Sequence, residues 1–470
     1  IIMPEKNVSY VFNDTETTGL NINFSQIIQI GSILTSENFD QIDTIDDECQ
    51  ILPWIVPDPG AYFTHKKIST LNSNCNKTHY DLIKEIHSTW QQWADSSNLV
   101  HITYNGHKFD EELLRRQFYW YLLDPYITNT NNNGRADMYV LFQLLANFYS
   151  DEIKTGKNEN GDLSLKLSDL AEANGISAEG AHDALEDCIL MVELGKIIKE
   201  KAPEAWKIFI QGSSKKGNLD ILRSEKFCLL GEVLRRNKYV YPIYPCGQNN
   251  SNQNQIIVCD LYFNPEELFK LKDHELLEQL GTQGGAFKLV SINKSMPVTP
   301  LSSISKPSSY LDLSIKELTR RANLLKENFE FSERLSELLI KKQKSYPPPK
   351  YVDQAIYERF PSDSDRLWME KFHISTWQDK TKLKEGFEDS RYRELASRII
   401  ALEKPDLLSD DENEDFSQFI NERLFTKGPW LNLSQAIQKL EKYDSDDSDH
   451  LKIKNALKEH LQNLEKTNSA

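Results

Sequence analysis

The residues best suited to chemistry begin with two carboxylates separated by a single residue. Asp14 and Glu16 lie in the segment NDTETTGL (13–20), directly after a short apolar run. Side chains alternate along a strand, so both carboxylates would project from one face and could reach the same divalent cation. Without a cation they would repel each other, and hard oxygen ligands of this kind suit Mg²⁺ or Mn²⁺. A polar turn built on the Thr-Thr-Gly sequence is the alternative interpretation.

A second candidate carboxylate lies in TYNGHKFDEELLRR (103–116). Here a predicted strand runs through an Asn-Gly turn into a helix that begins near Asp110. Asp110 could join the metal site, or it could merely cap its own helix. In the second case Glu111 and Glu112 would be first-turn acids that the helix dipole favours.

A third segment, EGAHDALEDCILMVELGKII (179–198), combines a histidine with an acid on an apolar helix face. Asp187 shares that face with residues such as Leu190 and Leu194, where an isolated ionised carboxylate is costly unless it is paired or metal-bound. Histidine titrates near neutral pH, so His182 at the helix entrance could take a proton from water. A surface or capping histidine is the alternative.

The order of these segments resembles the DEDDh family of 3′ to 5′ exonucleases. The resemblance implies two Mg²⁺ ions, with Mn²⁺ able to substitute, and a histidine, His182, that activates water for attack on the terminal phosphodiester. It also implies that Glu16 contacts the substrate. The implied metal ligands, which also count as catalytic residues, are Asp14, Glu16, Asp110 and Asp187.

Further matches extend the resemblance over nearly the whole chain, to the long bacterial members of this family that degrade single-stranded DNA. They are YNGHKFDEE (104–112), FYWYLLDPY (118–126), RADMYVLFQLL (135–145), LSLKLSDLAEANGI (163–176), KLVSINKSMP (288–297) and FPSDSDR (360–366). The fold implied is α/β: an RNase H-like exonuclease domain, then an SH3-like β domain with appended helices, then an α-helical C-terminal domain.

The matched positions also imply a path for the substrate strand. Lys166 stands where the family usually has an arginine that binds the phosphate of the terminal nucleotide. Lysine keeps the charge but lacks the bidentate fork, so phosphate positioning would be looser. Ordinary packing or a solvated strand end is the alternative for any one of the other positions. Those other path residues are Arg115, Tyr126, Asn254 and Lys288.

The elements that must position these residues can be read from hydrophobic periodicity. Short apolar runs predict strands at 10–12, 26–34 and 99–104, and helical spacing predicts helices at 80–93, 110–123, 138–148 and 183–200. Later, β-rich runs at 238–244, 255–261 and 286–292 precede charged helices over 313–344. The prolines of SYPPPKYV (345–352) cannot continue a helix. We therefore predict domains at 1–202, 203–347 and 348–470.

Composition limits the kind of partner. The net charge of -16 argues against nonspecific coating of nucleic acid. It is compatible with an acidic nuclease, because metal-binding carboxylates add negative charge and a narrow basic groove can coexist with an acidic exterior. Six cysteines without a CxxC pair argue against a zinc site. The lack of a long apolar stretch and of a signal peptide predicts a cytoplasmic protein with no membrane contact.

The resemblance implies an exodeoxyribonuclease activity that degrades single-stranded DNA to 5′-mononucleotides, in DNA repair and recombination. It implies a monomer whose partners are single-stranded DNA and the acidic C-terminal tail of single-stranded-DNA-binding protein. Two alternatives stay open. The same chemistry could act on RNA, because discrimination of the 2′-OH cannot be read from one sequence. The chain could also be an inactive single-strand-binding protein that retains the fold.

Overall fold

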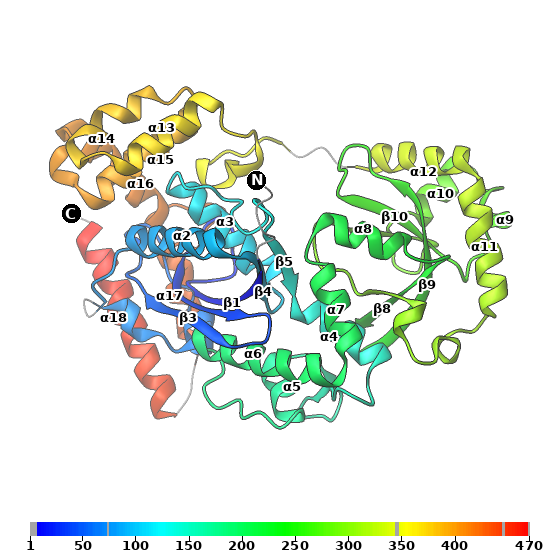
Figure 1. The fold of residues 1–470 in the computed structure, drawn as a ribbon. Coiled ribbons are helices and arrows are strands. Elements are labelled where there is room, and N and C mark those ends of the chain that lie inside the picture. Colours follow the sequence, from blue (N-terminus) through cyan, green and yellow to red (C-terminus); the bar gives the residue numbers. More distant parts are fainter. Residues whose placement is uncertain (1–6, 73–74, 344–346, 444–446, 469–470) are drawn as a thin grey trace.

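A computed structural model describes residues 7–72, 75–343, 347–443 and 447–468. Of the predicted proline-rich linker, Ser345 and Tyr346 lie outside these ranges. The elements form three groups along the chain: a central α/β unit, a β unit at the right, and C-terminal helices at the upper left and left (Figure 1). The predicted fold class is confirmed.

The first unit is built on a five-stranded sheet of order β3-β2-β1-β4-β5. β1 is antiparallel to β2 and parallel to β4, and β4 is parallel to β5. The predicted strands are present: those at 10–12 and 26–34 are longer than expected, and that at 99–104 has the expected length, shifted by one residue. The polar edge strand β3 was not predicted, because its side chains are exposed or only partly buried and carry no apolar alternation. The bounds are β1 (Val8–Thr17), β2 (Ile27–Ser36), β3 (Gln41–Glu48), β4 (Asn98–Thr103) and β5 (Gly134–Asp137).

Helices cover both faces of this sheet. On β1, Phe12 packs into one hydrophobic core beside α6, whereas its neighbour Val11 packs into another beside α2 and α3. α6 approaches β2 closely at Gly31, where a Cβ atom would lie 2.4 Å from the Ala184 carbonyl oxygen, so only glycine fits. The helices are α1 (Pro59–His65), α2 (His79–Ser96), α3 (Asp110–Trp120), α4 (Met138–Phe148), α5 (Leu167–Ala173) and α6 (Ala184–Lys201); β6 (Gly156–Lys157) and β7 (Leu163–Ser164) form a small hairpin.

The second unit contains a five-stranded sheet of order β11-β10-β9-β8-β12. It confirms the β-rich character predicted for this part of the chain. Phe148 of α4 packs against Gly231 of β8, so one hydrophobic core runs from the first unit into the second. The strands are β8 (Cys228–Leu234), β9 (Asn237–Gln248), β10 (Gln255–Asp260), β11 (Phe287–Ser291) and β12 (Val298–Pro300); the helices are α7 (Pro203–Gln211), α8 (Lys215–Arg223), α9 (Pro265–Leu268), α10 (Asp273–Gln279), α11 (Ile315–Glu327) and α12 (Phe329–Lys342).

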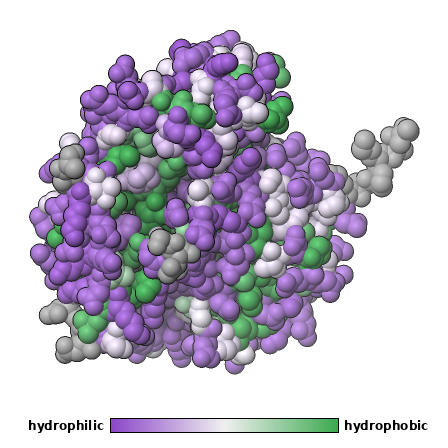
Figure 2. All heavy atoms as spheres, turned by 90° about the vertical axis from the view of Figure 1, so that its left-hand side faces the viewer, coloured by the Kyte–Doolittle hydropathy of each residue, from purple (hydrophilic) through white to green (hydrophobic). Residues whose placement is uncertain are grey.

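The C-terminal part is helical, as predicted. Its helices pack on α1, α2 and α3 of the first unit, and a buried Asp353 pairs with both Arg398 and Arg423. This face is mainly hydrophilic, with hydrophobic side chains gathered in hollows (Figure 2). None of the helices in the described ranges has the length and apolarity needed to cross a membrane. The helices are α13 (Asp363–Ile374), α14 (Trp377–Leu383), α15 (Ser390–Glu403), α16 (Asp410–Phe425), α17 (Leu433–Glu441) and α18 (Ser448–Asn468).

Candidate active site

Three carboxylates from two elements meet above the end of β1. Asp14 and Glu16 project from the face of β1 that α6 covers, and Asp187 projects from the first turn of α6. Each offers one carboxylate oxygen, and these oxygens all lie within 4.8 Å of one another. The close approach of α6 at Gly31 brings its first turn to this position. A donor set of clustered carboxylates fits a hard divalent cation.

Asp110 reaches the same region from α3. It is buried, and its carboxylate accepts a hydrogen bond from the hydroxyl of Thr15, the residue between Asp14 and Glu16. Asp110 is the first residue of α3, and the N-cap position belongs to Phe109. The structure therefore places Asp110 beside the strand that carries the other two carboxylates, in contact with a side chain of that strand.

The electrostatics of the cluster favour a bound cation. Burial, reinforced by the charges of Asp110 and Asp187, raises the pKa of Asp14 well above its usual range. Burial also raises the pKa of Glu16 to about 8. Burial raises the pKa values of Asp110 and Asp187 to about 6, despite the Thr15 hydrogen bond to Asp110 and the charge of His182 near Asp187. Divalent cations would relieve this repulsion and replace the protons.

His182 lies at the rim of the cluster. Its side chain is exposed, and its backbone N–H donates a hydrogen bond to the Asp187 carboxylate. Its φ of 72° falls in the left-handed region, which is uncommon for residues other than glycine. This conformation sets the imidazole beside the carboxylates and open to solvent, where it could reach a water molecule.

Two residues that the sequence analysis missed connect the cluster to its surroundings. The ammonium group of Lys67 contacts the carboxylate of Asp183 and lies 3.1 Å from Glu48 Oε1. The imidazole Nε2 of His65 lies 3.2 Å from the carbonyl oxygen of Thr17, at the end of β1. The segment 65–69 carries no motif, so nothing in its sequence indicates these contacts.

The predicted strand-path residues Arg115 and Tyr126 lie together. The guanidinium of Arg115 stands 5.2 Å from the centre of the Tyr126 ring, and it also pairs with Glu111 at 3.2 Å. The Tyr126 ring lies 5.7 Å from that of Phe360. Tyr126 and Phe360 both line a cavity of about 520 Å³ between the first unit and α13. Glu111 is a first-turn acid of α3, and it also pairs with His107, Arg115 and Arg135.

The other predicted path residues are more dispersed. Lys166 is exposed and directly precedes α5. Lys288 belongs to the second unit, where its Nζ lies 3.7 Å from the centre of the Tyr241 ring and 3.5 Å from Glu232 Oε2. Asn254 precedes β10, and its carbonyl accepts a hydrogen bond from the N–H of Ile292.

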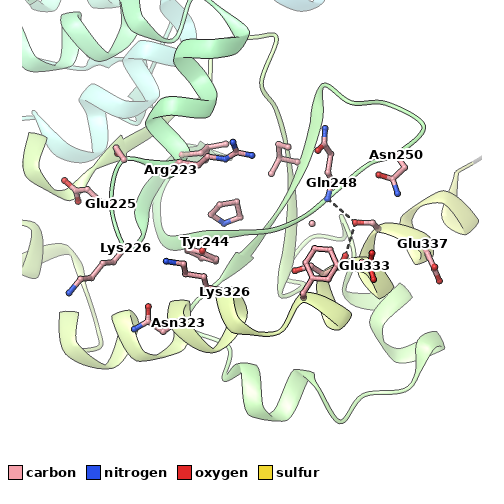
Figure 3. A pocket seen from close by; sticks show the side chains of 18 residues that line it. Arg223, Glu225, Lys226, Tyr244, Gln248, Asn250, Asn323, Lys326, Glu333 and Glu337 are labelled. Carbon is pink, nitrogen blue, oxygen red and sulfur yellow. Dashed lines mark hydrogen bonds between the residues drawn. The ribbon is translucent and has the colours of Figure 1, made fainter.

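A voluminous groove in this molecule lies apart from the candidate catalytic residues. A groove of about 940 Å³ lies in the second unit, between β9, the end of α8 and the helices α11 and α12 (Figure 3). Basic side chains gather around Tyr244 at one end of it, and Glu333 and Glu337 lie at the other. The carboxylates that could bind metal lie in the first unit.

Known proteins resemble this chain over nearly its whole length. Three family models match successive parts of the chain: "Exonuclease" at residues 11–194, "Exonuclease I SH3-like domain" at 231–341 and "Exonuclease I C-terminal domain" at 350–464. Among curated proteins, exodeoxyribonuclease I of Buchnera aphidicola subsp. Schizaphis graminum is 27% identical over 459 residues, covering 94% of this chain and 93% of its own length.

Solved structures share the fold over almost the whole chain. Exonuclease I of E. coli in complex with a dA16 oligonucleotide matches with a TM-score of 0.82 and 22% identity, covering 97% of this chain and 100% of that one. A structure described as SSB/Exonuclease I in complex with the inhibitor CFAM matches with a TM-score of 0.81 and 21% identity, covering 98% and 100%. The three units of this chain therefore adopt an arrangement known from solved exonucleases.

Proposed function

The chain belongs to the exodeoxyribonuclease I family, and from this premise we propose that it hydrolyses single-stranded DNA from the 3′ end and releases 5′-mononucleotides in DNA repair and recombination. The observation that carries this function is the cluster of Asp14, Glu16 and Asp187, whose ligand oxygens lie within 4.8 Å of one another, with Asp110 beside it. Four acids whose pKa values are raised together suit a site that binds two divalent cations.

The four carboxylates would hold two Mg²⁺ ions, which when bound activate the attacking water and stabilise the departing 3′ oxygen. Glu16 would also contact the terminal nucleotide. A ring nitrogen of His182 would take the proton from the attacking water, and the hydrogen bond from the His182 backbone to Asp187 keeps this loop beside the metal ligands. Lys166 would bind the phosphate of the terminal nucleotide as a point charge.

The rest of the strand would follow the aromatic and basic residues already described. Tyr126 and Phe360 offer adjacent rings on which bases can stack, and such stacking tolerates any sequence. Arg115 supplies positive charge beside the Tyr126 ring. Asn254 and Lys288 would contact the strand farther from the carboxylates. Binding that depends on backbone charge should weaken as salt rises.

We further propose the setting in which the enzyme works. Domain limits at 1–202, 203–347 and 348–470 would separate the catalytic unit from two units that enclose the strand. One solved relative is described as SSB/Exonuclease I, a pairing of the nuclease with SSB. By family likeness, this chain would bind the acidic tail of single-stranded-DNA-binding protein, act as a monomer and reside in the cytoplasm.

A gel time course tests the proposed function. Matched oligonucleotides, labelled at the 3′ or the 5′ end, would be supplied as single-stranded DNA, duplex DNA and single-stranded RNA, each with Mg²⁺ or with EDTA. We expect Mg²⁺-dependent shortening of single-stranded DNA from its 3′ end, with duplex and RNA largely spared. Preferential trimming of RNA would instead identify an exoribonuclease. Absence of turnover on every substrate would leave an inactive binding protein.

A further inference from the structure

We propose that Lys67 is a positioning residue for the nuclease reaction: its ammonium group fixes the start of α6, which carries Asp187, against the end of the sheet. The inference rests on the proposed function, because it concerns the geometry of the same carboxylate cluster. Lys67 lies in the short segment between α1 and α2, far in sequence from every predicted ligand. Its side chain is 15% exposed, which is low for a lysine and indicates a fixed conformation.

The first contact of Lys67 is with the residue that caps α6. Asp183 Oδ1 accepts hydrogen bonds from the backbone N–H groups of Leu185 at 3.1 Å and Glu186 at 3.2 Å. The other carboxylate oxygen, Oδ2, accepts from Lys67 and, at 3.2 Å, from Gln29 of β2. Asp183 therefore ties the first turn of α6 to two other segments, and Lys67 supplies the charged half of that connection.

The position of this cap determines the geometry of the active site. Asp183 directly follows His182, and its carbonyl oxygen accepts the N–H of Asp187 at 2.9 Å. A rotation or shift of the first turn of α6 would therefore move the proposed base and a proposed metal ligand together. A displacement of about 1 Å at such a site can lower the rate by about 100-fold.

The segment that carries Lys67 is itself attached to the sheet. The backbone N–H of Lys67 donates to His65 Nδ1 at 3.0 Å, so the ring proton lies on Nε2, which donates to the carbonyl oxygen of Thr17 at 3.2 Å. Burial lowers the pKa of His65 to about 4, which keeps this ring neutral near pH 7. Thr17 directly follows Glu16. The segment thus contacts the end of β1 on one side and α6 on the other.

Glu48 completes the contacts on the side of β3. Its Oε1 lies 3.1 Å from Lys67 Nζ, and its Oε2 accepts a hydrogen bond from Ser69 at 2.6 Å. Lys67 is also close enough to Glu16 for its charge to offset part of the rise that burial causes in the pKa of that carboxyl. One ammonium group therefore connects β3 to the cap of α6 beside the carboxylate cluster.

The test compares the wild-type enzyme with Lys67→Met, which keeps a long side chain and removes the charge. Lys77→Met is the matched control, since Lys77 also pairs with two acids, Asp47 at 3.0 Å and Glu85 at 2.7 Å, away from the cluster. We expect kcat on single-stranded DNA to fall about 10- to 100-fold in Lys67→Met and to stay near wild type in Lys77→Met. DNA affinity in EDTA should not change.

Two further readouts separate positioning from general damage. Amide hydrogen exchange at the start of α6 should quicken in Lys67→Met and not in Lys77→Met. The double variant Lys67→Met/Asp183→Asn should lose little more activity than Asp183→Asn alone, because both substitutions remove the same contact between Lys67 and Asp183. The inference is overturned if kcat is unchanged in Lys67→Met or falls equally in both lysine variants. It is also overturned if hydrogen exchange in α6 is unchanged, or if the activity losses of Lys67→Met and Asp183→Asn are additive. A wild-type enzyme without turnover would instead refute the proposed function.

Discussion

The hydroxyl of Thr15 on β1 donates a hydrogen bond to the carboxylate of Asp110 at the start of α3. Thr15 lies between two proposed metal ligands and on the opposite face of the strand from them. Asp14 and Glu16 face α6, so the end of β1 is contacted from both sides by helices that carry acids. The metal site is therefore a meeting point of three segments that are far apart in the sequence.

Replacing Asp187 with Ala should abolish Mg²⁺-dependent turnover, a loss of about 1,000-fold or more, because a proposed ligand of the catalytic cations disappears. The fold, and DNA binding in EDTA, should stay intact. Glu186→Ala is the matched control, since Glu186 is the exposed neighbour on the same helix. Turnover by gel assay and DNA affinity by anisotropy check both variants. Near-normal turnover in Asp187→Ala would remove this residue from the site.

Replacing His182 with Ala should lower the single-turnover rate by about 100- to 10,000-fold, the range typical of a lost general base. Titration with Mn²⁺, followed by calorimetry, should show unchanged metal affinity, because the exposed imidazole is not a proposed ligand. The rate should also become less sensitive to pH near neutrality. The assignment as base is wrong if the rate of the variant equals that of the wild type across this range.

The stability of the metal-free protein should fall as pH rises. The pKa of Glu16 is raised from 4.5 to about 8, so the folded state holds a proton that the unfolded state has released between these values. The resulting stabilisation is complete at low pH and is lost as pH passes through about 8. In EDTA, the Tm of the wild type should decrease between about pH 6 and about pH 9. This decrease should be smaller in Glu16→Gln than in the control variant Glu186→Gln. A slope that is identical in both variants would contradict the shift.

Replacing Lys166 with Arg should lower KM for single-stranded DNA, because a guanidinium can bind a phosphate through two parallel hydrogen bonds. Lys166→Ala should raise KM by about 10-fold, as expected when a phosphate contact to a charged side chain is lost. Steady-state kinetics on one oligonucleotide at fixed salt compares both variants with the wild type. If Lys166→Ala leaves KM unchanged, Lys166 does not contact the strand.

Much of the fold could be predicted because the buried strands and helices of the first unit are apolar at regular spacing. Asp187 stood out as an acid on an apolar helix face, and the alternation along β1 placed Asp14 and Glu16 together. The edge strand β3 lacks any such signal, because its side chains are exposed or only partly buried. Hydrophobic periodicity and residue spacing therefore predicted the positions of the acids. They did not predict the edge strand that lies beside them.

Contacts between distant segments could not be predicted. Glu111 is a first-turn acid of α3, as one interpretation of the sequence had it, but its pairing with Arg135 of β5 and with Arg115 was not predicted. Lys67 and His65 acquire their roles only when β1, β3 and α6 come together. A single sequence gives the type of such a residue but not its contact partners. Those partners determine whether a lysine side chain is solvated or held in one conformation.

The hydrophobic core that continues from α4 into β8 makes the nuclease part difficult to excise. A gene cut after the end of α6 would encode a fragment whose Phe148 has lost its neighbour Gly231 and whose Tyr10 has lost Trp206. Such a fragment would expose hydrophobic surface to water and tend to aggregate. The three units can be distinguished by their topology, but the shared hydrophobic core makes the first two depend on each other for folding.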